Sequence, residues 1–432
     1  MTDTLRITGG RVLQPDMTVE QGDVLVDQDA GTILEVGDVD EGAGDESLDA
    51  EGGVVMPGLV NAHTHVAMTL LRGYADDKPL ESWLREDIWP AEGELTPEDV
   101  RVGAELGVLE MIKGGTTAFA DMYFHVPEIA DVVDRAGVRA RLGHGVVTIG
   151  KDERDAHDDN EESIAIAVEY DGYADDRVQT AYMPHSLTTV GEGYLRDYAA
   201  QAREHGVPVH FHANETRDEV EPIVEERGER PLEYADDLGL LTDEDFVAHG
   251  VHTDDTEIDL LAARGTGVIH CPASNMKLAS GMAPIQEMRD AGVTVGIGTD
   301  GAASNNDLSV FDELRDAAML GKLAADDANA VPASAAVKMA TAGGADAIGL
   351  PGGRLAEGEA ADIAVVDFTA PHLTPVHDHV SHLAYAATAG DVRHTVCDGQ
   401  VLMRDREVQT LDEDAVLERA AEAAAGVAAR AE

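Results

Sequence analysis

The chain has 432 residues and a formal net charge of −55, because 85 aspartates and glutamates stand against 30 lysines and arginines. A hydrophobic content of 44% is sufficient for a buried core, so the charge does not indicate intrinsic disorder. The acidic excess would repel phosphate groups, which excludes nucleic acids and anionic membranes as partners.

The charge also predicts a protein adapted to high salt. At about 1 M salt the Debye length falls to about 3 Å, which removes most of the self-repulsion expected in dilute buffer. The two cysteines, Cys271 and Cys397, are too few for a disulfide framework, and the first residues do not resemble a signal peptide. No apolar stretch is long enough for a membrane span. We therefore expect a cytoplasmic protein of a halophile.

Both ends of the chain have the pattern of short strands. Residues 5–8 and 24–26 alternate between polar and apolar side chains, and strand-like segments return at residues 362–367 and 396–401. We expect residues 1–57 and 351–432 to form one small β domain. Residues 412–429 are rich in alanine and predict a peripheral helix at its end.

Between these ends, apolar strand-like runs alternate with helical segments. One helix has a clear start at Thr96-Pro97, an N-cap followed by proline, and a clear end at Lys113-Gly114. Eight runs separated by helices predict an α/β fold, a (β/α)₈ barrel of the TIM type over residues 58–350. The eight runs are residues 54–60, 116–121, 138–147, 178–183, 207–213, 246–251, 267–271 and 293–298.

Histidines and an aspartate follow several of these runs, where the active site of such a barrel lies. A single His-x-His pair is weak evidence among 17 histidines, but here the candidates come from three different strand ends. Three imidazoles and a carboxylate suit Zn²⁺ or Fe²⁺ and leave a position for water. We therefore predict one divalent metal ion per subunit, zinc in preference to iron, held by His63, His65, His212 and Asp300.

Two more polar residues lie near the predicted metal site. Glu215 follows His212 by three residues, and its functional interpretation is a general acid and base that is not a ligand. His249 ends the next run and would bind the same water. The alternatives are a solvated loop carboxylate for Glu215 and a core histidine for His249. His210 is interpreted as a core histidine or one that supports the ligands, and His377 and His379 as solvated.

The chain resembles the amidohydrolase superfamily at residues 56–65, MPGLVNAHTH. Three further stretches resemble its 5-methylthioadenosine/S-adenosylhomocysteine deaminase branch, and the resemblance extends over essentially the whole chain. It implies that the terminal domain is a β-sandwich around the barrel. The three stretches are residues 68–77, 83–92 and 271–278.

The resemblance implies a site with one metal ion. Relatives with two ions carry a modified lysine at the end of strand four, where this chain has His185. The metal ligands carry over to the four residues already predicted. The catalytic residues implied are Glu215, His249 and Asp300, and the substrate-binding residues are Glu92, His185, Glu215 and Asp300, with Glu92 on the ribose hydroxyls.

Two positions depart from the superfamily pattern. Asn214 stands where an apolar residue is common, a change that we expect to be harmless. Residues 151–160 are strongly acidic where relatives often carry arginines for the distal end of the substrate, so a substrate with a carboxylate tail is not implied for this chain.

The predicted function is hydrolytic deamination of an adenosine thioether, such as 5′-methylthioadenosine or S-adenosylhomocysteine, by a homo-oligomer that binds a small nucleoside. Another amidohydrolase activity is the first alternative, such as a guanine or cytosine deaminase or an aminotriazine or chlorotriazine hydrolase. Glu92 argues against these alternatives, because a free base has no ribose to bind. A non-catalytic metalloprotein that acts as an assembly module is the alternative from another class.

Overall fold

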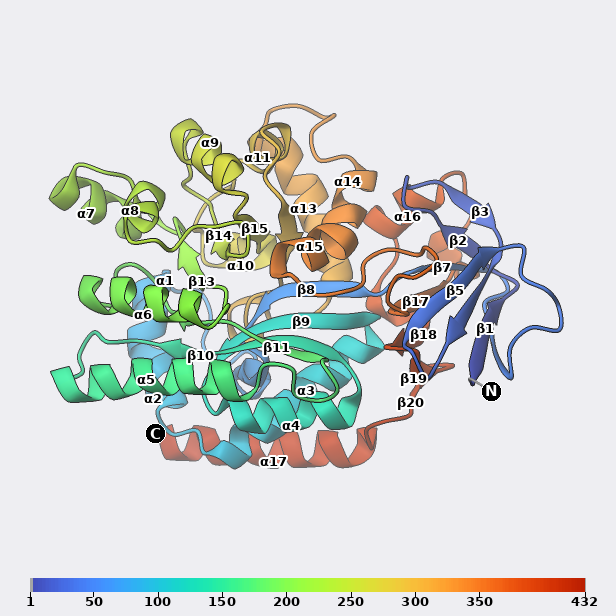
Figure 1. Cartoon of the computed structure of the whole chain (residues 1–432), viewed down its shortest axis with the longest axis horizontal. Helices are drawn as coiled ribbons and strands as arrows, with labels where there is room; N and C mark the ends of the chain where they lie inside the picture. Colours follow the sequence, from blue (N-terminus) through green and yellow to red (C-terminus); the bar gives the residue numbers. More distant parts are fainter. Residues whose placement is uncertain (1–2, 432) are drawn as a thin grey trace.

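The protein has a mixed α/β architecture in the computed structural model, which describes residues 3–431. Strands and helices alternate through the middle of the chain, and strands from both ends lie together at one side of the molecule (Figure 1). The terminal strands are β1 (Thr4–Thr8), β2 (Arg11–Leu13), β3 (Val19–Gln21), β4 (Asp23–Asp27), β5 (Thr32–Gly37), β6 (Glu46–Asp49), β7 (Gly53–Pro57), β17 (Ile363–Asp367), β18 (Val392–Cys397), β19 (Gln400–Arg404) and β20 (Glu407–Val408).

These terminal strands form two sheets. One has the order β5-β4-β1-β6, and the other has the order β20-β19-β18-β17-β7-β2-β3. Alternate residues of β1 and β4 are buried, as expected for strands with one face on a core. Leu5 and Val24 of the first sheet share one buried cluster with Val55 and Ile363 of the second, so both ends of the chain pack into one core.

Two predicted strand ranges at these ends are wrong. Residues 54–60 are not one strand, because Pro57-Gly58 separates β7 of the terminal sheet from β8, which starts at Leu59. Residues 396–401 span a hairpin, because Asp398 and Gly399 take φ values of 51° and 75° and turn the chain between β18 and β19. An Asp-Gly pair favours such a tight turn.

The middle of the chain contains the predicted parallel strands, with the fourth run broken in two. They form two sheets of order β11-β10-β9-β8, with β12 paired to β10, and β13-β14-β15-β16. Parallel bridges join Tyr182 to Val209 and Ser186 to His212 between the sheets. The strands are β8 (Leu59–Thr64), β9 (Thr116–Tyr123), β10 (Arg139–Val146), β11 (Val178–Thr180), β12 (Met183–Pro184), β13 (His210–Ala213), β14 (Phe246–His249), β15 (Gly267–His270) and β16 (Val295–Ile297).

The α-helices lie around these strands (Figure 1). None in the described part of the chain is long and apolar enough to cross a membrane. The helices are α1 (Leu80–Trp83), α2 (Trp89–Glu92), α3 (Pro97–Lys113), α4 (Val126–Ala136), α5 (Glu153–Glu169), α6 (Glu192–Glu204), α7 (Arg217–Arg227), α8 (Pro231–Asp237), α9 (Asp255–Arg264), α10 (Pro272–Lys277), α11 (Ile285–Asp290), α12 (Ala302–Asn305), α13 (Val310–Ala324), α14 (Ala333–Lys338), α15 (Gly344–Ile348), α16 (His379–Tyr385) and α17 (Glu413–Ala431).

Five short 3₁₀ or π turns complete the described elements. They are η1 (Val66–Leu71), η2 (Leu84–Ile88), η3 (Met339–Gly343), η4 (Pro371–Leu373) and η5 (Ala389–Asp391).

The helix predicted from Thr96 to Lys113 is confirmed as α3. Thr96 and Asp99 form a capping box at its start, in which each side chain accepts from the other residue's backbone N–H. The predicted tail helix is confirmed as α17, which packs against α3 (Figure 1). Arg419 and Arg430 of α17 pair with Glu105 and Asp99 of α3, both at 2.6 Å.

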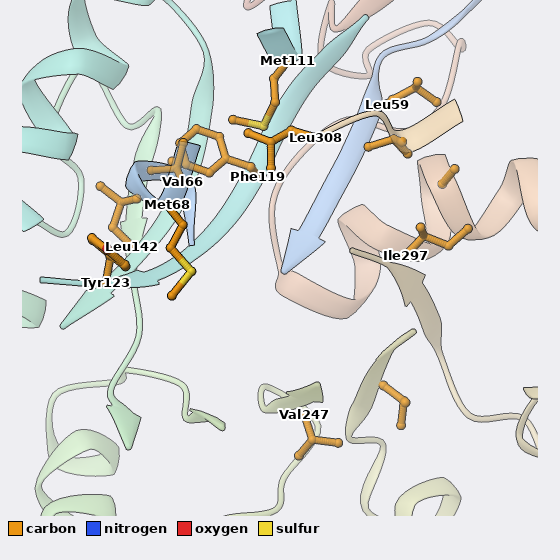
Figure 2. Close-up of a cluster of buried hydrophobic side chains, with 14 of the residues drawn as sticks. Leu59, Val66, Met68, Met111, Phe119, Tyr123, Leu142, Val247, Ile297 and Leu308 are labelled. Carbon is orange, nitrogen blue, oxygen red and sulfur yellow. The ribbon is translucent and has the colours of Figure 1, made fainter. Parts of the chain in front are cut away.

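A large apolar core holds the parallel strands in place. Phe119 of β9 lies beside Met111 of α3 and Leu308 of the loop before α13 (Figure 2). All three side chains are at most 1% exposed. This packing fixes the strands, so that the side chains at their C-terminal ends are held in defined positions.

Candidate metal centre and active site

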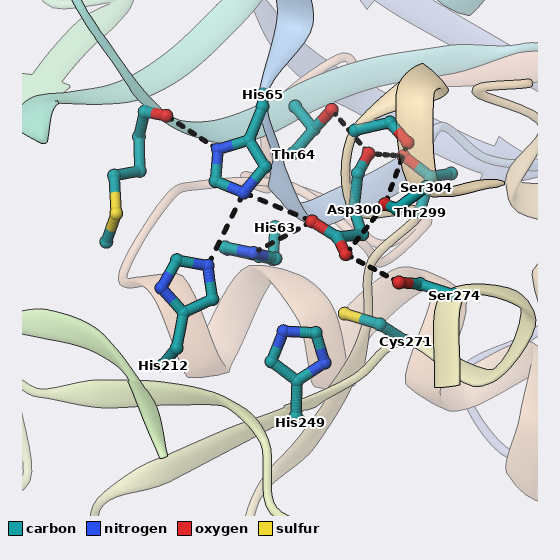
Figure 3. Close-up of polar contacts among 12 residues, drawn as sticks. His63, Thr64, His65, His212, His249, Cys271, Ser274, Thr299, Asp300 and Ser304 are labelled. Atoms are coloured by element: carbon teal, nitrogen blue, oxygen red, sulfur yellow. Dashed lines mark hydrogen bonds and ion pairs between the residues drawn. The ribbon is translucent and has the colours of Figure 1, made fainter. Parts of the chain in front are cut away.

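Five of the predicted site residues meet at the C-terminal ends of the parallel strands (Figure 3). His63 lies on β8, His212 on β13 and His249 at the end of β14. One ligand atom from each of these and one from Asp300 all lie within 4.8 Å of one another. His65 Nε2 lies 3.1 Å from Asp300 Oδ1 and 3.4 Å from His212 Nε2.

A glycine brings the two distant parts of this site together. A Cβ atom at Gly298 would lie 2.7 Å from the backbone N and O of His63, so only glycine allows this close approach. The backbone N–H of Asp300 then donates to the His63 carbonyl at 3.0 Å. Asp300 and His249 both take a left-handed φ, at 61° and 73°, a strained backbone that is common at functional sites.

The hydrogen bonds of His65 and His212 fix the direction of their lone pairs. Nδ1 of His65 donates to the Met122 carbonyl, and Nδ1 of His212 donates to the His185 carbonyl, each at 2.7 Å. A carbonyl oxygen can only accept, so each ring carries its proton on Nδ1. Each ring therefore presents an Nε2 lone pair to the centre.

His63 and His249 are oriented in the same way. His210 Nδ1 donates to the Phe246 carbonyl, which leaves His210 Nε2 to accept from His63 Nδ1, both at 2.9 Å. His249 Nδ1 lies 3.0 Å from Asn275 Oδ1, which accepts its proton. Nε2 of His63 is buried without a hydrogen-bond partner among residues 3–431. Such support of the outer ring nitrogen is typical of histidines that bind metal.

Asp300 directs one oxygen into this centre. Its Oδ2 accepts from Ser274 Oγ at 2.6 Å and Ser304 Oγ at 2.9 Å, whereas its Oδ1 faces His63 and His65. Burial raises the pKa of Asp300, but the His63 and His65 rings beside Oδ1 hold that pKa well below its usual range. The carboxylate is thus ionised with one free oxygen.

The charge of the centre also suits a cation. Burial lowers the pKa of His63 to about 4, which keeps this ring neutral and its lone pair available. His65 is equally enclosed, yet hydrogen bonding to the Asp300 carboxylate raises its pKa to about 9. The centre therefore attracts positive charge beside Asp300, and its donor set fits a divalent metal ion.

Glu215 lies next to this centre and is not part of the ligand cluster. It is 8% exposed, and its Oε2 is 3.7 Å from His249 Nε2. Burial raises the pKa of Glu215, with Asp300 adding to the effect and His249 opposing it. A carboxyl group with a raised pKa can both accept and donate a proton near neutral pH.

The loop that carries Glu215 is held by buried polar contacts. Asn214 takes a left-handed φ of 53°, a conformation that asparagine adopts more readily than apolar residues. Its Nδ2 donates to Glu257 Oε2 at 2.8 Å, and the Glu215 backbone N–H donates to Glu219 Oε2 at 2.9 Å. The asparagine at position 214 therefore stabilises this loop, which is more than the harmless replacement expected from the sequence.

A cavity extends from the metal centre and is lined by the predicted substrate-binding residues. Glu92 ends α2 and is half-buried, and His185 follows β12. Burial raises the pKa of Glu92 to about 7, against the nearby Tyr123 phenol and His65, which lower it. Burial lowers the pKa of His185 to about 4, so its ring is neutral.

The other two histidines considered in the sequence lie outside the cluster. His377 is exposed and His379 begins α16, far along the chain in the terminal part of the molecule. His210 lies behind His63, as described above, which agrees with a supporting position.

The sequence analysis missed three residues that the structure places at or beside the site. Tyr123 ends β9 and lines the cavity, Asn275 orients His249, and Glu219 binds the backbone of Glu215. Tyr123 could have been found as a polar residue at a strand end, but the predicted strand stopped at residue 121. No spacing pattern in the sequence indicates the other two contacts.

Comparison with known proteins gives the class to which this fold and site belong. The chain matches the amidohydrolase family over residues 54–402 and therefore belongs to that family. The resemblance inferred from the sequence motifs is thereby confirmed.

Several individual proteins are similar to the chain over nearly its whole length. The chain is 70% identical to a 5-methylthioadenosine/S-adenosylhomocysteine deaminase of Halobacterium salinarum, across 100% of both chains. An adenosine deaminase from Xanthomonas campestris with bound zinc has a similar structure, with a TM-score of 0.93 and 36% identity over 99% of both chains. Atrazine chlorohydrolase from Arthrobacter aurescens complexed with zinc has a TM-score of 0.89 and 26% identity, over 97% of this chain and 100% of its own.

Proposed function

We propose that this protein is a metal-dependent deaminase that releases ammonia from adenosine thioethers, 5′-methylthioadenosine, S-adenosylhomocysteine or both. The observation that carries the proposal is the group of ligand atoms from His63, His212, His249 and Asp300, which lie within 4.8 Å of one another. His65 lies 3.4 Å from His212, and Glu215 lies 3.7 Å from His249. The high identity to the Halobacterium salinarum deaminase over the full chain supports the choice of substrate.

The proposed metal ligands are His63, His65, His212 and Asp300, and the proposed ion is Zn²⁺. A divalent ion there supplies Lewis acidity and lowers the pKa of water towards about 7. Asp300 carries the one full negative charge among the four ligands, and burial keeps the His63 ring neutral. The zinc in the two similar solved structures supports this choice over iron.

Glu215 is the proposed proton carrier of the reaction. It takes a proton from the attacking water and delivers it to the ring nitrogen beside the amino-bearing carbon. The oxygen of water adds to that carbon as a hydroxyl group. The proton of this hydroxyl then passes through Glu215 to the amino group, the C–N bond breaks, and ammonia leaves with an inosine-type product. His249, 3.7 Å from Glu215, and Asp300 orient the water for this attack.

The nucleoside would occupy the cavity beside the metal centre. Glu92 is proposed to bind the ribose hydroxyls, and His185 to contact the base from the end of the fourth strand segment. A free base or a triazine has no ribose hydroxyl groups for Glu92 to bind. The position of Glu92 therefore favours a nucleoside over the substrates of other family members.

The two parallel sheets are proposed to form a single (β/α)₈ barrel over residues 58–350. The bridges between Tyr182 and Val209 and the bond from Asp300 to His63 support this closure from both edges. The shared core of the terminal sheets supports a β-sandwich formed by residues 1–57 and 351–432. The cytoplasmic location and the homo-oligomeric state stay predictions.

Replacing Glu215 by Gln tests the proposed mechanism directly. We expect kcat to fall by about 10²- to 10⁴-fold with the metal content unchanged, because the amide cannot carry the proton. Ammonia release is measured in high salt with 5′-methylthioadenosine, S-adenosylhomocysteine, adenosine and guanine. Glu221→Gln, on the exposed side of α7, is the matched control and should keep full activity. Near-normal turnover in Glu215→Gln would refute the assigned role.

A further inference from the structure

The cavity beside the metal centre contains a buried phenol whose hydroxyl group is unused by the protein. Tyr123 is 2% exposed and lies at the C-terminal end of β9, where its side chain lines the cavity together with Glu92 and His65. Tyr123 Oη has no hydrogen-bond partner within the described range of residues 3–431. A buried polar atom without a partner is costly, so such an atom in a cavity indicates a ligand.

Glu92 has an unused oxygen in the same cavity. Its Oε1 is buried and also lacks a hydrogen-bond partner in the part of the chain that the structure describes. The two groups line the same cavity. Burial raises the pKa of both, the Glu92 carboxylate adds to the effect on Tyr123, and the phenol opposes it on Glu92. They approach the cavity from different elements, since Glu92 ends α2 and Tyr123 ends β9.

Two aromatic rings lie beside Tyr123. Its ring lies 5.3 Å from that of Phe124 and 6.5 Å from that of His65, measured between ring centroids. This packing holds the ring in place, so the hydroxyl group is the part of the side chain that can form a hydrogen bond with a ligand. A carboxylate that accepts and a phenol that both donates and accepts would together satisfy two neighbouring hydroxyl groups of a ligand.

We propose that Tyr123 is a specificity-determining residue that binds a ribose hydroxyl of the nucleoside beside Glu92. The inference rests on the proposed function, in which a nucleoside occupies this cavity. In this arrangement the ribose is bound by two groups, the carboxylate of Glu92 from α2 and the phenol of Tyr123 from β9.

The test removes the phenol oxygen and the substrate hydroxyls separately. The kcat/KM values of wild type and Tyr123→Phe are measured for adenosine, 2′-deoxyadenosine and 3′-deoxyadenosine in high salt. We expect Tyr123→Phe to lose about 10- to 100-fold with adenosine and to be nearly unchanged with one of the deoxynucleosides, because a contact that is already absent cannot be lost again.

Tyr182→Phe is the matched control. Tyr182 is a fully buried tyrosine that donates to Asn160 Oδ1 at 2.7 Å and is outside the cavity lining, so its loss should not change the ratio between substrates. Metal content and the unfolding temperature of both variants show whether they fold. Tyr123→His, which keeps a polar ring, should restore part of the preference for the hydroxyl group.

The possible outcomes separate the inference from the proposed function. Equal losses with all three nucleosides, or no loss with any, would overturn the role of Tyr123 while leaving deamination intact. If wild type releases no ammonia from 5′-methylthioadenosine or S-adenosylhomocysteine, measured beside these three nucleosides, the proposed function itself fails. A loss confined to substrates that carry one particular hydroxyl supports the inference and identifies that hydroxyl.

Discussion

His65 and His249 both present a lone pair to the metal centre, but their neighbours differ. Nε2 of His65 lies beside Asp300 and His212, at 3.1 and 3.4 Å, within the group of proposed ligands. Nε2 of His249 lies 3.7 Å from Glu215, the proposed proton carrier. At the scale of single residues, these contacts support the proposal that His65 binds the metal and His249 the water. Nε2 of His249 also belongs to the group of ligand atoms within 4.8 Å of one another, so experiment has to separate the two roles.

Two alanine variants test this assignment. We expect His65→Ala to lose most of its metal, because a ligand is removed, and to lose activity as a result. His249→Ala should keep its metal while kcat falls by about 10²-fold or more. Metal content per subunit is measured by elemental analysis beside the rate of ammonia release. Full metal in His65→Ala together with a metal-free His249→Ala would reverse the assignment.

At the scale of secondary structure, the start of α7 fixes the proposed proton carrier. Thr216 is the N-cap of this helix and accepts from the Glu219 backbone N–H. The Glu219 side chain reaches back to the N–H of Glu215, one residue before the cap. The contact that begins the helix therefore also holds the backbone of Glu215, and it comes from an acid in the first turn, where acids are favoured.

Glu219 also makes stability depend on pH. Burial raises its pKa from 4.5 to about 8, so the native state retains a proton that the unfolded state has already lost in this range. The stability that this proton contributes is complete below about pH 4.5 and is lost as pH rises through about 8. Glu219→Gln has no such proton, so its stability relative to wild type should rise between these two pH values.

Thermal unfolding of wild type and Glu219→Gln across this pH range, at constant high salt, measures the effect. The amide oxygen of Gln can still accept from the Glu215 N–H, so this variant should remain active. Glu219→Ala is the contrasting variant, in which loss of the contact should cost about 1–2 kcal/mol of stability and lower kcat. Parallel pH profiles for wild type and Glu219→Gln would contradict the prediction.

At the scale of the whole molecule, the excess of acidic residues is the main electrostatic feature of the protein. Three of the few cations surround one buried acid: Glu105 has a side chain only 1% exposed and is paired with Arg101, Arg135 and Arg419 from α3, α4 and α17. Most other carboxylates have no such partner, since the net charge is −55. Their mutual repulsion opposes the compact state unless salt screens it.

We therefore expect the unfolding temperature to fall by on the order of 10 °C or more when KCl is lowered from about 2 M to about 0.1 M. Differential scanning calorimetry at several salt concentrations measures this change. Sucrose at high concentration serves as the control, because it stabilises by exclusion and does not screen charge. An unfolding temperature independent of salt would show that repulsion is not what limits stability.

The sequence alone determined those features that depend on residues close together in the chain. The strand runs, the capped helix α3 and the positions of His63, His65, His212, Glu215 and Asp300 could be predicted, because periodicity and caps are local and strand ends of parallel sheets share one face. Its two errors have different causes. At residues 54–60 the apolar content continues to either side of Gly58, and only the pairing shows where one strand ends. At residues 396–401 the Asp398-Gly399 turn signal was present in the sequence but was counted as part of one strand.

Only the tertiary structure decided how these side chains act together. The lone pair of His63 depends on His210 and, beyond it, on a carbonyl of Phe246, and the ring of His249 depends on Asn275. Tyr123 and Glu92 meet across elements about 30 residues apart. Such contacts are set by the packing of distant segments, which imposes no spacing on the sequence and so cannot be inferred from it.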